Sequence, residues 1–209
     1  MDTTQLAVDL FDKRADDYQE KYMDQGLYHH SFDVFCGYIP TKNAAVLDIA
    51  CGPGNVAQYL LQKRPDFDIL GIDLAPNMVR LAQANNPNAT FRVMDIRAVR
   101  QLDQHYDGIL CCFGLPYLSK EAAIALISDV AALLKPNGIF YLSTMEDDYE
   151  KSGTRYSSKG EALYMFFHQA DYLTEALTQN GFTVLNVIRQ DFPTTDGTKT
   201  TDLLMIAKR

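Results

Sequence analysis

The sequence has no long apolar run and fewer basic than acidic residues. No stretch approaches the roughly 18–20 apolar residues that a membrane-spanning helix needs. The first residues, MDTTQLAVDLFDKRADD, are acidic and interrupted by polar side chains, unlike a signal peptide. We therefore expect neither membrane insertion nor secretion. The 19 Lys and Arg against 27 Asp and Glu give a formal charge of -8, which disfavours nucleic acid as a partner because its phosphates are negative.

Cysteine is also scarce. Cys36, Cys51, Cys111 and Cys112 form neither a CxxC pair nor a Cys/His cluster with the spacing of a zinc site. This pattern favours a reduced, cytoplasmic protein without a metal. Cys111 and Cys112 should point to opposite faces of one strand, one into the core and the other toward a ligand crevice.

The 209 residues, 47% of them hydrophobic, are enough for one domain with a sizeable core. From residue 44 onward, short β-branched runs alternate with longer amphipathic segments, a pattern typical of parallel strands joined by crossover helices. It predicts an α/β protein with a seven-stranded, mostly parallel sheet and helices on both faces. The expected strands are residues 45–50, 69–73, 90–94, 106–112, 139–143, 182–188 and 202–207.

Three further features complete the predicted domain. The last two strands are joined without room for a helix, so we expect them to form an antiparallel hairpin. Residues 1–43 should form a helical cap, with helices over 6–23 and 30–38. Residues 145–167 interrupt the alternation and should form a lid-like excursion at the edge of the sheet.

A glycine turn follows the first strand, in the segment DIACGPG at residues 48–54. Glycine lets a ligand approach the backbone closely, and open parallel sheets bind ligands at this edge. A nucleotide or nucleoside is the expected ligand. The pattern Gly52-x-Gly54-x-x-Ala57 also fits a dinucleotide fingerprint, with Asp73 at the distance of a ribose-binding acid. The glycines alone therefore leave NAD and S-adenosylmethionine open.

Three acids favour one of these ligands. Asp48, Asp73 and Asp95 each lie at the end of one of three successive predicted strands. A carboxylate at Asp48 would repel a pyrophosphate but attract a ligand that carries an ammonium and a sulfonium. Asp73 could accept hydrogen bonds from two ribose hydroxyls, and Asp95 could lie near the adenine amino group. The acids thus favour S-adenosylmethionine over NAD.

Residues 42–209 resemble the class I S-adenosylmethionine-dependent methyltransferases of the small-molecule type. The family motif D/E-x-G-x-G-x-G corresponds to residues 48–54, with Ala50 in place of the first glycine. The segments GIDLAPNM (71–78), YDGILCCF (106–113) and LLKPNG (133–138) extend the likeness. The resemblance implies a Rossmann-like fold, S-adenosylmethionine as cofactor and methyl transfer to a small molecule.

The resemblance also implies roles for particular residues. Leu74 and Met78 would line the adenine pocket, and Cys112 and Phe113 would flank the methionine portion of the cofactor. The segment FDKRADDY (11–18) is similar to a cap in which a tyrosine closes over the cofactor. Arg14 is better explained as a residue of a solvated helix face than as a ligand of the cofactor carboxylate. The expected cofactor-binding residues are Tyr18, Asp48, Ala50, Gly52, Gly54, Asp73, Leu74, Met78, Asp95, Ile96, Cys112 and Phe113.

Methyl transfer from a sulfonium is an in-line displacement that needs neither a catalytic triad nor a metal. Tyr117 and His168 are the candidates for a catalytic group. A hydrophobic plug explains Tyr117 equally well, and a helix cap explains His168 better. We expect a small, partly apolar acceptor between the cap and the excursion, which contains Tyr149, Tyr156 and Tyr164. An NAD-dependent oxidoreductase and a non-catalytic S-adenosylmethionine-binding module remain as alternatives.

Overall fold

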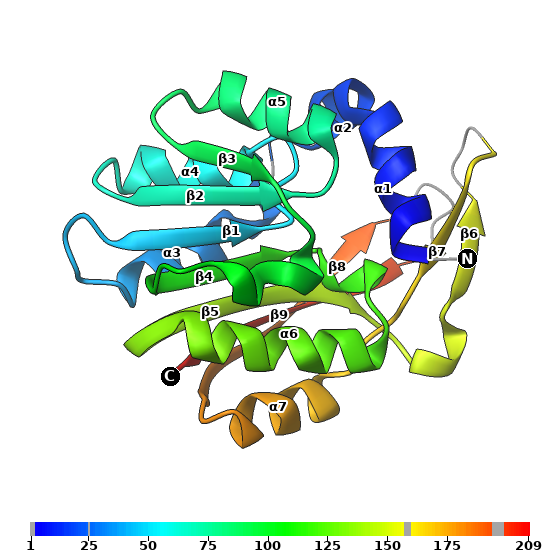
Figure 1. Ribbon diagram of the computed structural model, residues 1–209. Helices are drawn as coiled ribbons and strands as arrows, with labels where there is room; N and C mark the ends of the chain where they lie inside the picture. The colour runs from blue at the N-terminus through cyan, green and yellow to red at the C-terminus, as the bar shows by residue number, and fades with distance from the viewer. Residues whose placement is uncertain (1–2, 25, 157–159, 194–198) are drawn as a thin grey trace.

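The computed structural model describes residues 3–24, 26–156, 160–193 and 199–209. Its centre is a seven-stranded sheet in the order β3-β2-β1-β4-β5-β9-β8 (Figure 1). Strands β1 to β5 run parallel to one another, and β9 lies antiparallel to both β5 and β8. The predicted fold class is confirmed. The strands are β1 Ala45–Ile49, β2 Asp68–Asp73, β3 Thr90–Val93, β4 Tyr106–Cys112, β5 Leu134–Glu146, β8 Thr183–Pro193 and β9 Lys199–Lys208.

Helices cover both faces of this sheet (Figure 1). Helices α3 His29–Gly37, α4 Asn55–Lys63 and α5 Pro76–Asn85 contribute to a core on one face, and α6 Lys120–Leu133 and α7 Ala170–Gln179 to a core on the other. Every residue of β1 is buried, as a strand covered on both faces requires. Burial on both faces explains why the central strands appear in the sequence as continuous apolar runs.

The predicted helix over residues 6–23 is two helices. α1 Thr3–Lys13 and α2 Ala15–Tyr22 are separated at Arg14, whose φ of -110° and ψ of 19° lie outside the helical range. Figure 1 shows α1 beside the ends of the parallel strands. None of the helices in the described part of the chain is long and apolar enough to span a bilayer.

The predicted excursion contains regular structure of its own. It begins with the 3-10 helix η4 Tyr149–Lys151 and continues as the two-stranded hairpin of β6 Gly153–Tyr156 and β7 Ala162–Met165. Figure 1 shows this hairpin next to α1, and the Phe166 amide donates to the carbonyl oxygen of Pro116 at 2.8 Å. The excursion is therefore attached to the loop that follows β4. Three further 3-10 helices are η1 Gly26–Tyr28, η2 Ile96–Gln101 and η3 Leu115–Tyr117.

Candidate functional site

A cavity lies at the carboxyl ends of β1, β2 and β4, beneath α1. It contains about 790 Å³ of empty space, part of it open to solvent. The residues that line it come from five segments of the chain. They are Thr4, Ala7, Val8, Phe11, Tyr18, Ala50, Gly52, Asp73, Leu74, Ala75, Met78, Met94, Ile96, Cys112, Phe113, Gly114, Tyr117 and Leu118.

Most of the expected cofactor-binding residues line this cavity, and three do not. The nine that do are Tyr18, Ala50, Gly52, Asp73, Leu74, Met78, Ile96, Cys112 and Phe113. The side chain of Cys111 is fully buried in the core. The two adjacent cysteines therefore lie in different environments, Cys112 at the cavity and Cys111 in the core, as the alternation along a strand predicts. Gly54, Asp48 and Asp95 lie outside the lining.

The glycine turn adopts left-handed backbone conformations at three positions. The φ angles are +57° at Ala50, +54° at Gly52 and +80° at Gly54. Alanine tolerates this conformation at a cost that glycine does not incur, which explains how Ala50 can stand where the family motif has glycine. At Gly54, which precedes α4, a Cβ atom would lie 2.4 Å from Asn86 Nδ2 and 3.1 Å from Ala82 Cα. Gly54 therefore supports the turn from behind the cavity by allowing α4 and α5 to pack closely.

We expect the Gly54→Ala substitution to lower the free energy of unfolding by about 2–3 kcal/mol. About 1–2 kcal/mol comes from the left-handed conformation, and about 1 kcal/mol from displacing Asn86, which donates to the carbonyl oxygens of Gly54 and Ala82. Gly181→Ala is the matched control, because its φ is +82° but a Cβ there would meet nothing within 4 Å. Urea unfolding should show a larger loss in the free energy of unfolding for Gly54→Ala than for Gly181→Ala. Equal losses would contradict the packing argument.

Asp73 connects the glycine turn to the start of α5. Its Oδ2 accepts from the Gly52 amide and its Oδ1 from the Ala75 amide, each at 2.9 Å. Burial raises the pKa of Asp73, while these backbone donors lower it. Each carboxylate oxygen has a second lone pair, so Asp73 can also accept two hydroxyl groups from a ligand in the cavity.

Asp48 is buried in β1 with no exposed surface. Neither of its carboxylate oxygens has a hydrogen-bond partner among the described residues. Burial, together with the nearby charge of Asp73, raises the pKa of Asp48 to about 8. An unpaired buried carboxylate is costly, so a positive group bound in the adjoining cavity would relieve this cost. Asp48 fits a cationic ligand, although it acts from behind the cavity surface.

Asp95, which we expected near the adenine amino group, lies outside the cavity lining. Asp95 caps η2 by accepting from the Arg97 amide at 2.8 Å, and its Oδ2 lies 2.7 Å from Arg97 Nη2. The neighbouring Ile96 reaches the cavity instead. An aspartate followed two residues later by an arginine was the local signal for this contact.

Of the two candidate catalytic residues, the structure brings only Tyr117 to the cavity. Its ring contacts that of Phe11 edge to face at 5.0 Å, and its carbonyl oxygen accepts from the Thr4 hydroxyl at 2.9 Å. Tyr117 therefore both faces the cavity and anchors α1. Burial raises the pKa of its hydroxyl above the ordinary value, so it remains protonated at neutral pH.

His168 lies outside the cavity lining. Its Nε2 is 2.9 Å from the carbonyl oxygen of Leu115, and its Nδ1 contacts the Tyr172 hydroxyl. The side chain is fully buried, and this burial lowers its pKa. The cap position of α7 belongs to Gln169 rather than to His168. His168 is thus a buried connector between η3 and α7.

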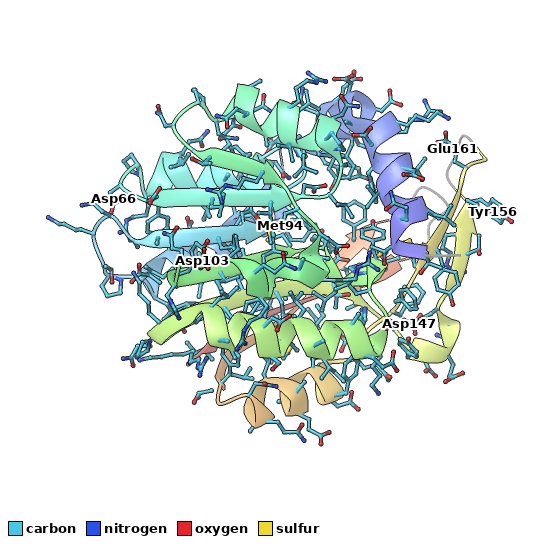
Figure 2. All side chains as sticks on the ribbon, viewed as in Figure 1. Asp66, Met94, Asp103, Asp147, Tyr156 and Glu161 are labelled. Carbon is cyan, nitrogen blue, oxygen red and sulfur yellow. The ribbon has the colours of Figure 1, made fainter. Side chains whose placement is uncertain are left out.

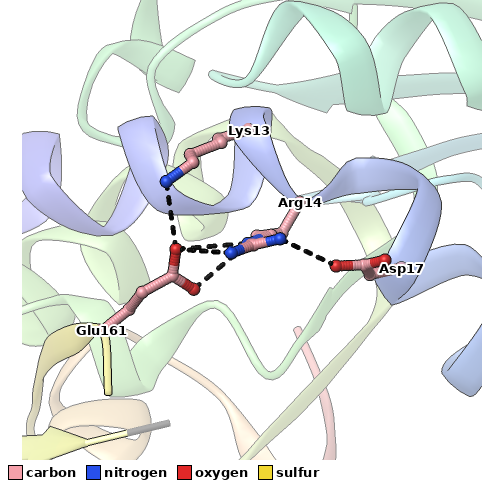
Figure 3. A network of polar contacts seen from close by, with 4 residues as sticks. All are labelled: Lys13, Arg14, Asp17 and Glu161. Atoms are coloured by element: carbon pink, nitrogen blue, oxygen red, sulfur yellow. Dashed lines mark hydrogen bonds and ion pairs between the residues drawn. The ribbon is translucent and has the colours of Figure 1, made fainter. Parts of the chain in front are cut away.

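Arg14 holds the hairpin β6–β7 against the N-terminal helices rather than facing the cavity. Figure 3 shows its guanidinium between Glu161 and Asp17. Glu161 accepts from Arg14 Nη2 at 2.9 Å and from Lys13 Nζ at 3.1 Å, and Asp17 lies 3.3 Å from Arg14 Nη1. We call Lys13, Arg14 and Glu161 the ionic latch. Glu161 is 147 residues from Arg14, so no local pattern could have indicated the contact.

The described residues of the aromatic excursion do not line the cavity. Tyr149 stacks against Phe166, Tyr164 contacts the same ring at 4.9 Å, and Tyr156 is 73% exposed and points outward (Figure 2). The missed lining residues belong mainly to α1. Thr4, Ala7, Val8 and Phe11 repeat at the i, i+3, i+4 and i+7 spacing of one helix face, and this spacing could have identified them from the sequence.

The cavity has the composition of a nucleoside site. Its lining is apolar apart from the carboxylate of Asp73, hydroxyl groups and backbone atoms. In the described residues, no group of three or more His, Cys, Asp or Glu side chains could hold a metal ion. A family model described as a methyltransferase domain matches residues 46–138.

Curated relatives include several methyltransferases. The ubiquinone biosynthesis O-methyltransferase of Xylella fastidiosa is 31% identical over 112 residues, which cover 51% of this chain and 44% of that protein. The trans-aconitate 2-methyltransferase of Methylobacterium nodulans is 30% identical over 112 residues, 54% of this chain and 42% of that protein. The chain spans about half the length of the curated relatives it matches.

Solved structures show the same fold over nearly the whole chain. Magnesium protoporphyrin IX methyltransferase from Synechocystis, solved with bound S-adenosylmethionine, has a TM-score of 0.73 and 20% identity and covers 100% of this chain and 98% of its own. The 1,6-didemethyltoxoflavin-N1-methyltransferase of Burkholderia thailandensis has a TM-score of 0.70 and 23% identity, covering 98% of this chain and 88% of its own. The matched residues 46–138 contain nearly all of β1 to β4 and the turns that follow these strands, which build most of the cavity. This part of the chain is a methyltransferase domain, similar in sequence and fold to the class I S-adenosylmethionine-dependent methyltransferases.

Proposed function

We propose that the protein transfers the methyl group of S-adenosylmethionine to a small-molecule acceptor. The observation that carries this proposal is the pair of acids at one end of an otherwise apolar cavity. Asp73 offers two oxygens inside the cavity, and Asp48 places an unpartnered carboxylate behind its wall. This arrangement suits a nucleoside with a positively charged tail and opposes a pyrophosphate.

The lining residues divide into groups with different tasks. Asp73 accepts hydrogen bonds from the ribose hydroxyls, and Leu74, Met78 and Ile96 pack against the adenine. Ala50 and Gly52 leave the backbone open to the methionine portion, with Asp48 compensating its positive charge. Cys112 and Phe113 flank the same portion, and Tyr18 closes over it: a Cβ on Gly52 would lie only 3.8 Å from its ring.

S-adenosylmethionine supplies an activated methyl group on a sulfonium. The protein therefore needs mainly to align the acceptor and exclude water. Helix α1 forms part of the cavity wall, and the ionic latch attaches the β6–β7 hairpin to the end of α1. Tyr117 is the polar side chain best placed to orient an acceptor. Because its hydroxyl remains protonated, Tyr117 forms hydrogen bonds rather than acting as the initial base. No role in proton transfer is assigned to His168.

A small molecule is the acceptor class that this largely apolar cavity favours. The acidic charge of the chain opposes nucleic acid. Relatives named for ubiquinone biosynthesis and trans-aconitate methylation support the same class. The four free cysteines fit a reducing cytoplasmic location.

Calorimetry with S-adenosylhomocysteine, S-adenosylmethionine and NADH tests the cofactor assignment. We expect binding of the first two ligands with micromolar dissociation constants and no binding of NADH. Incubation with S-adenosylmethionine and fractionated metabolite extracts should then produce S-adenosylhomocysteine. Binding of NADH alone would replace the proposal with an oxidoreductase, and cofactor binding without turnover in any fraction would indicate a non-catalytic module.

A further inference from the structure

A buried hydrogen bond connects the N-terminal cap to the end of the sheet. The Tyr28 hydroxyl donates to Asp202 Oδ2 at 2.6 Å, and the two residues are only 7% and 3% exposed. Asp202 lies in β9, opposite Met145 of β5 and Gln190 of β8. Among the described residues, Tyr28 is the only side chain that donates to this carboxylate. A buried acid with one donor is costly for a purely structural contact.

This pair lies directly behind one wall of the cavity. The ring of Tyr28 packs against that of Phe113 at 5.3 Å, and Phe113 lines the cavity. The strand order gives the same location, because Cys112 pairs with Ser143 and Ser143 with Leu204, two residues from Asp202. Strands are about 4.8 Å apart, so Leu204 is roughly two strand spacings from Cys112, and Asp202 lies two residues further along β9.

The backbone of Phe113 adopts an unfavourable conformation that neighbouring contacts must stabilise. Its φ of +54° is in the left-handed region, which is unfavourable for a bulky side chain. Its amide donates to the carbonyl oxygen and to the hydroxyl of Ser143. Asp202, through Tyr28, therefore helps to position Phe113 at the methionine end of the cavity.

The cavity contains no basic side chain to receive an anionic acceptor. Asp73 is its only charged lining residue in the described part of the chain. The two basic residues at the end of α1, Lys13 and Arg14, pair with Glu161 in the ionic latch. Lys21 is exposed and lies over the ring of Tyr22. Asp202 adds a further negative group near the methionine end.

We propose that the acceptor is a small aromatic molecule of neutral or positive charge, and that Asp202 sets this preference as a positioning residue. The aromatic rings of Phe11, Phe113 and Tyr117 provide surfaces on which a flat acceptor packs. The carboxylate of Asp202 opposes carboxylated or phosphorylated acceptors through its charge and fixes Phe113 through Tyr28. This inference rests on the proposed methyltransferase function.

Three phenols that share a two-carbon unit on the ring test the charge preference. Tyramine, 4-ethylphenol and 3-(4-hydroxyphenyl)propionate carry a positive, neutral and negative end, respectively. We expect the complex of the full chain with S-adenosylhomocysteine to bind the first two at least about tenfold more tightly than the third, measured by calorimetry. Equal or tighter binding of the propionate, or no binding of any of the three at about 10 mM, would overturn the inference.

Substitutions separate the charge of Asp202 from its hydrogen bond. Asp202→Asn still accepts from Tyr28 but removes the charge, and we expect the tyramine-to-propionate affinity ratio to fall at least about fivefold. Tyr28→Phe keeps the ring on Phe113 but removes the hydrogen bond that favours the ionised form of Asp202, so the ratio should fall in this variant too. The control Asp103→Asn changes an exposed acid that precedes β4 (Figure 2) and should leave the ratio unchanged.

The result for S-adenosylhomocysteine distinguishes the two proposals. We expect its affinity to be the same in Asp202→Asn, Asp103→Asn and the unaltered protein. An unaltered protein that fails to bind it would refute the proposed function. Normal binding of S-adenosylhomocysteine with an unchanged ratio in Asp202→Asn would refute only the role of Asp202. If Asp202→Asn does not fold, the affinity order of the unaltered protein still decides the acceptor class.

Discussion

Replacing Asp48 with asparagine is expected to stabilise the ligand-free protein at pH 8 while weakening its binding of S-adenosylmethionine. The folded-state pKa of Asp48 is raised to about 8, whereas its ordinary value is 3.8. Between these values the folded protein retains a proton that the unfolded chain releases, so the free energy of unfolding falls as pH rises. Asparagine has no such proton. Its advantage should therefore grow by about 2–4 kcal/mol from pH 5 to pH 8 and level off above pH 8.

Urea unfolding of the two ligand-free proteins at pH 5 and pH 8 measures this difference. Asp103→Asn is the control, since Asp103 is exposed and loses the same charge. Calorimetry should show that Asp48→Asn binds S-adenosylmethionine about tenfold more weakly, because the carboxylate no longer compensates the positive tail. Identical pH dependence in the original and substituted proteins would show that Asp48 is not held in a protonated, unpartnered state.

The Asp73→Ala substitution is expected to weaken binding of S-adenosylhomocysteine by about 1–3 kcal/mol, or roughly 5- to 150-fold. The change leaves the ribose hydroxyls without an acceptor and frees the amides of Gly52 and Ala75. Asp73→Asn should have an intermediate effect, because its one carbonyl oxygen can serve only one of these amides well. Calorimetry on each folded variant provides the affinities.

Asp107→Ala is a matched control for Asp73→Ala. Asp107 also accepts a backbone amide, that of Ala45 at 2.9 Å, and pairs with Lys135. It lies near the start of β4, away from the cavity. Its loss should lower stability without changing the affinity for S-adenosylhomocysteine. A folded Asp73→Ala protein with unchanged affinity would refute the ribose assignment.

The parts of the fold that follow from local pattern and chain connectivity were predictable. The alternation after residue 44 predicted the parallel strands, and the short connection between the last two predicted that β8 and β9 are antiparallel. The break at Arg14 was not predictable, because the residue that engages its side chain, Glu161, lies in a distant hairpin. The regular strands inside the excursion likewise depend on packing against distant segments.

The candidate site likewise combines features that were predictable from the sequence with features that were not. Strand ends placed Asp73 and Ile96 at one edge, because the carboxyl ends of parallel strands meet there. Strand position does not determine where a side chain points: Asp95 turns to Arg97, and Asp48 stays inside the sheet. The partners of His168, Leu115 and Tyr172, come together only through tertiary packing. Their contact therefore lies beyond what a local pattern can indicate.

The hydrogen bond between Tyr28 and Asp202 also bears on how the protein folds. These residues are 174 positions apart, and Thr4 and Tyr117, which join α1 to η3, are 113 apart. Contacts between such distant positions require long loops to close, so they form slowly compared with local ones. We therefore expect the parallel strands to assemble before the walls of the cavity. During synthesis, the binding site would be completed only after β9 has left the ribosome, later than the parallel strands β1 to β5 that support it.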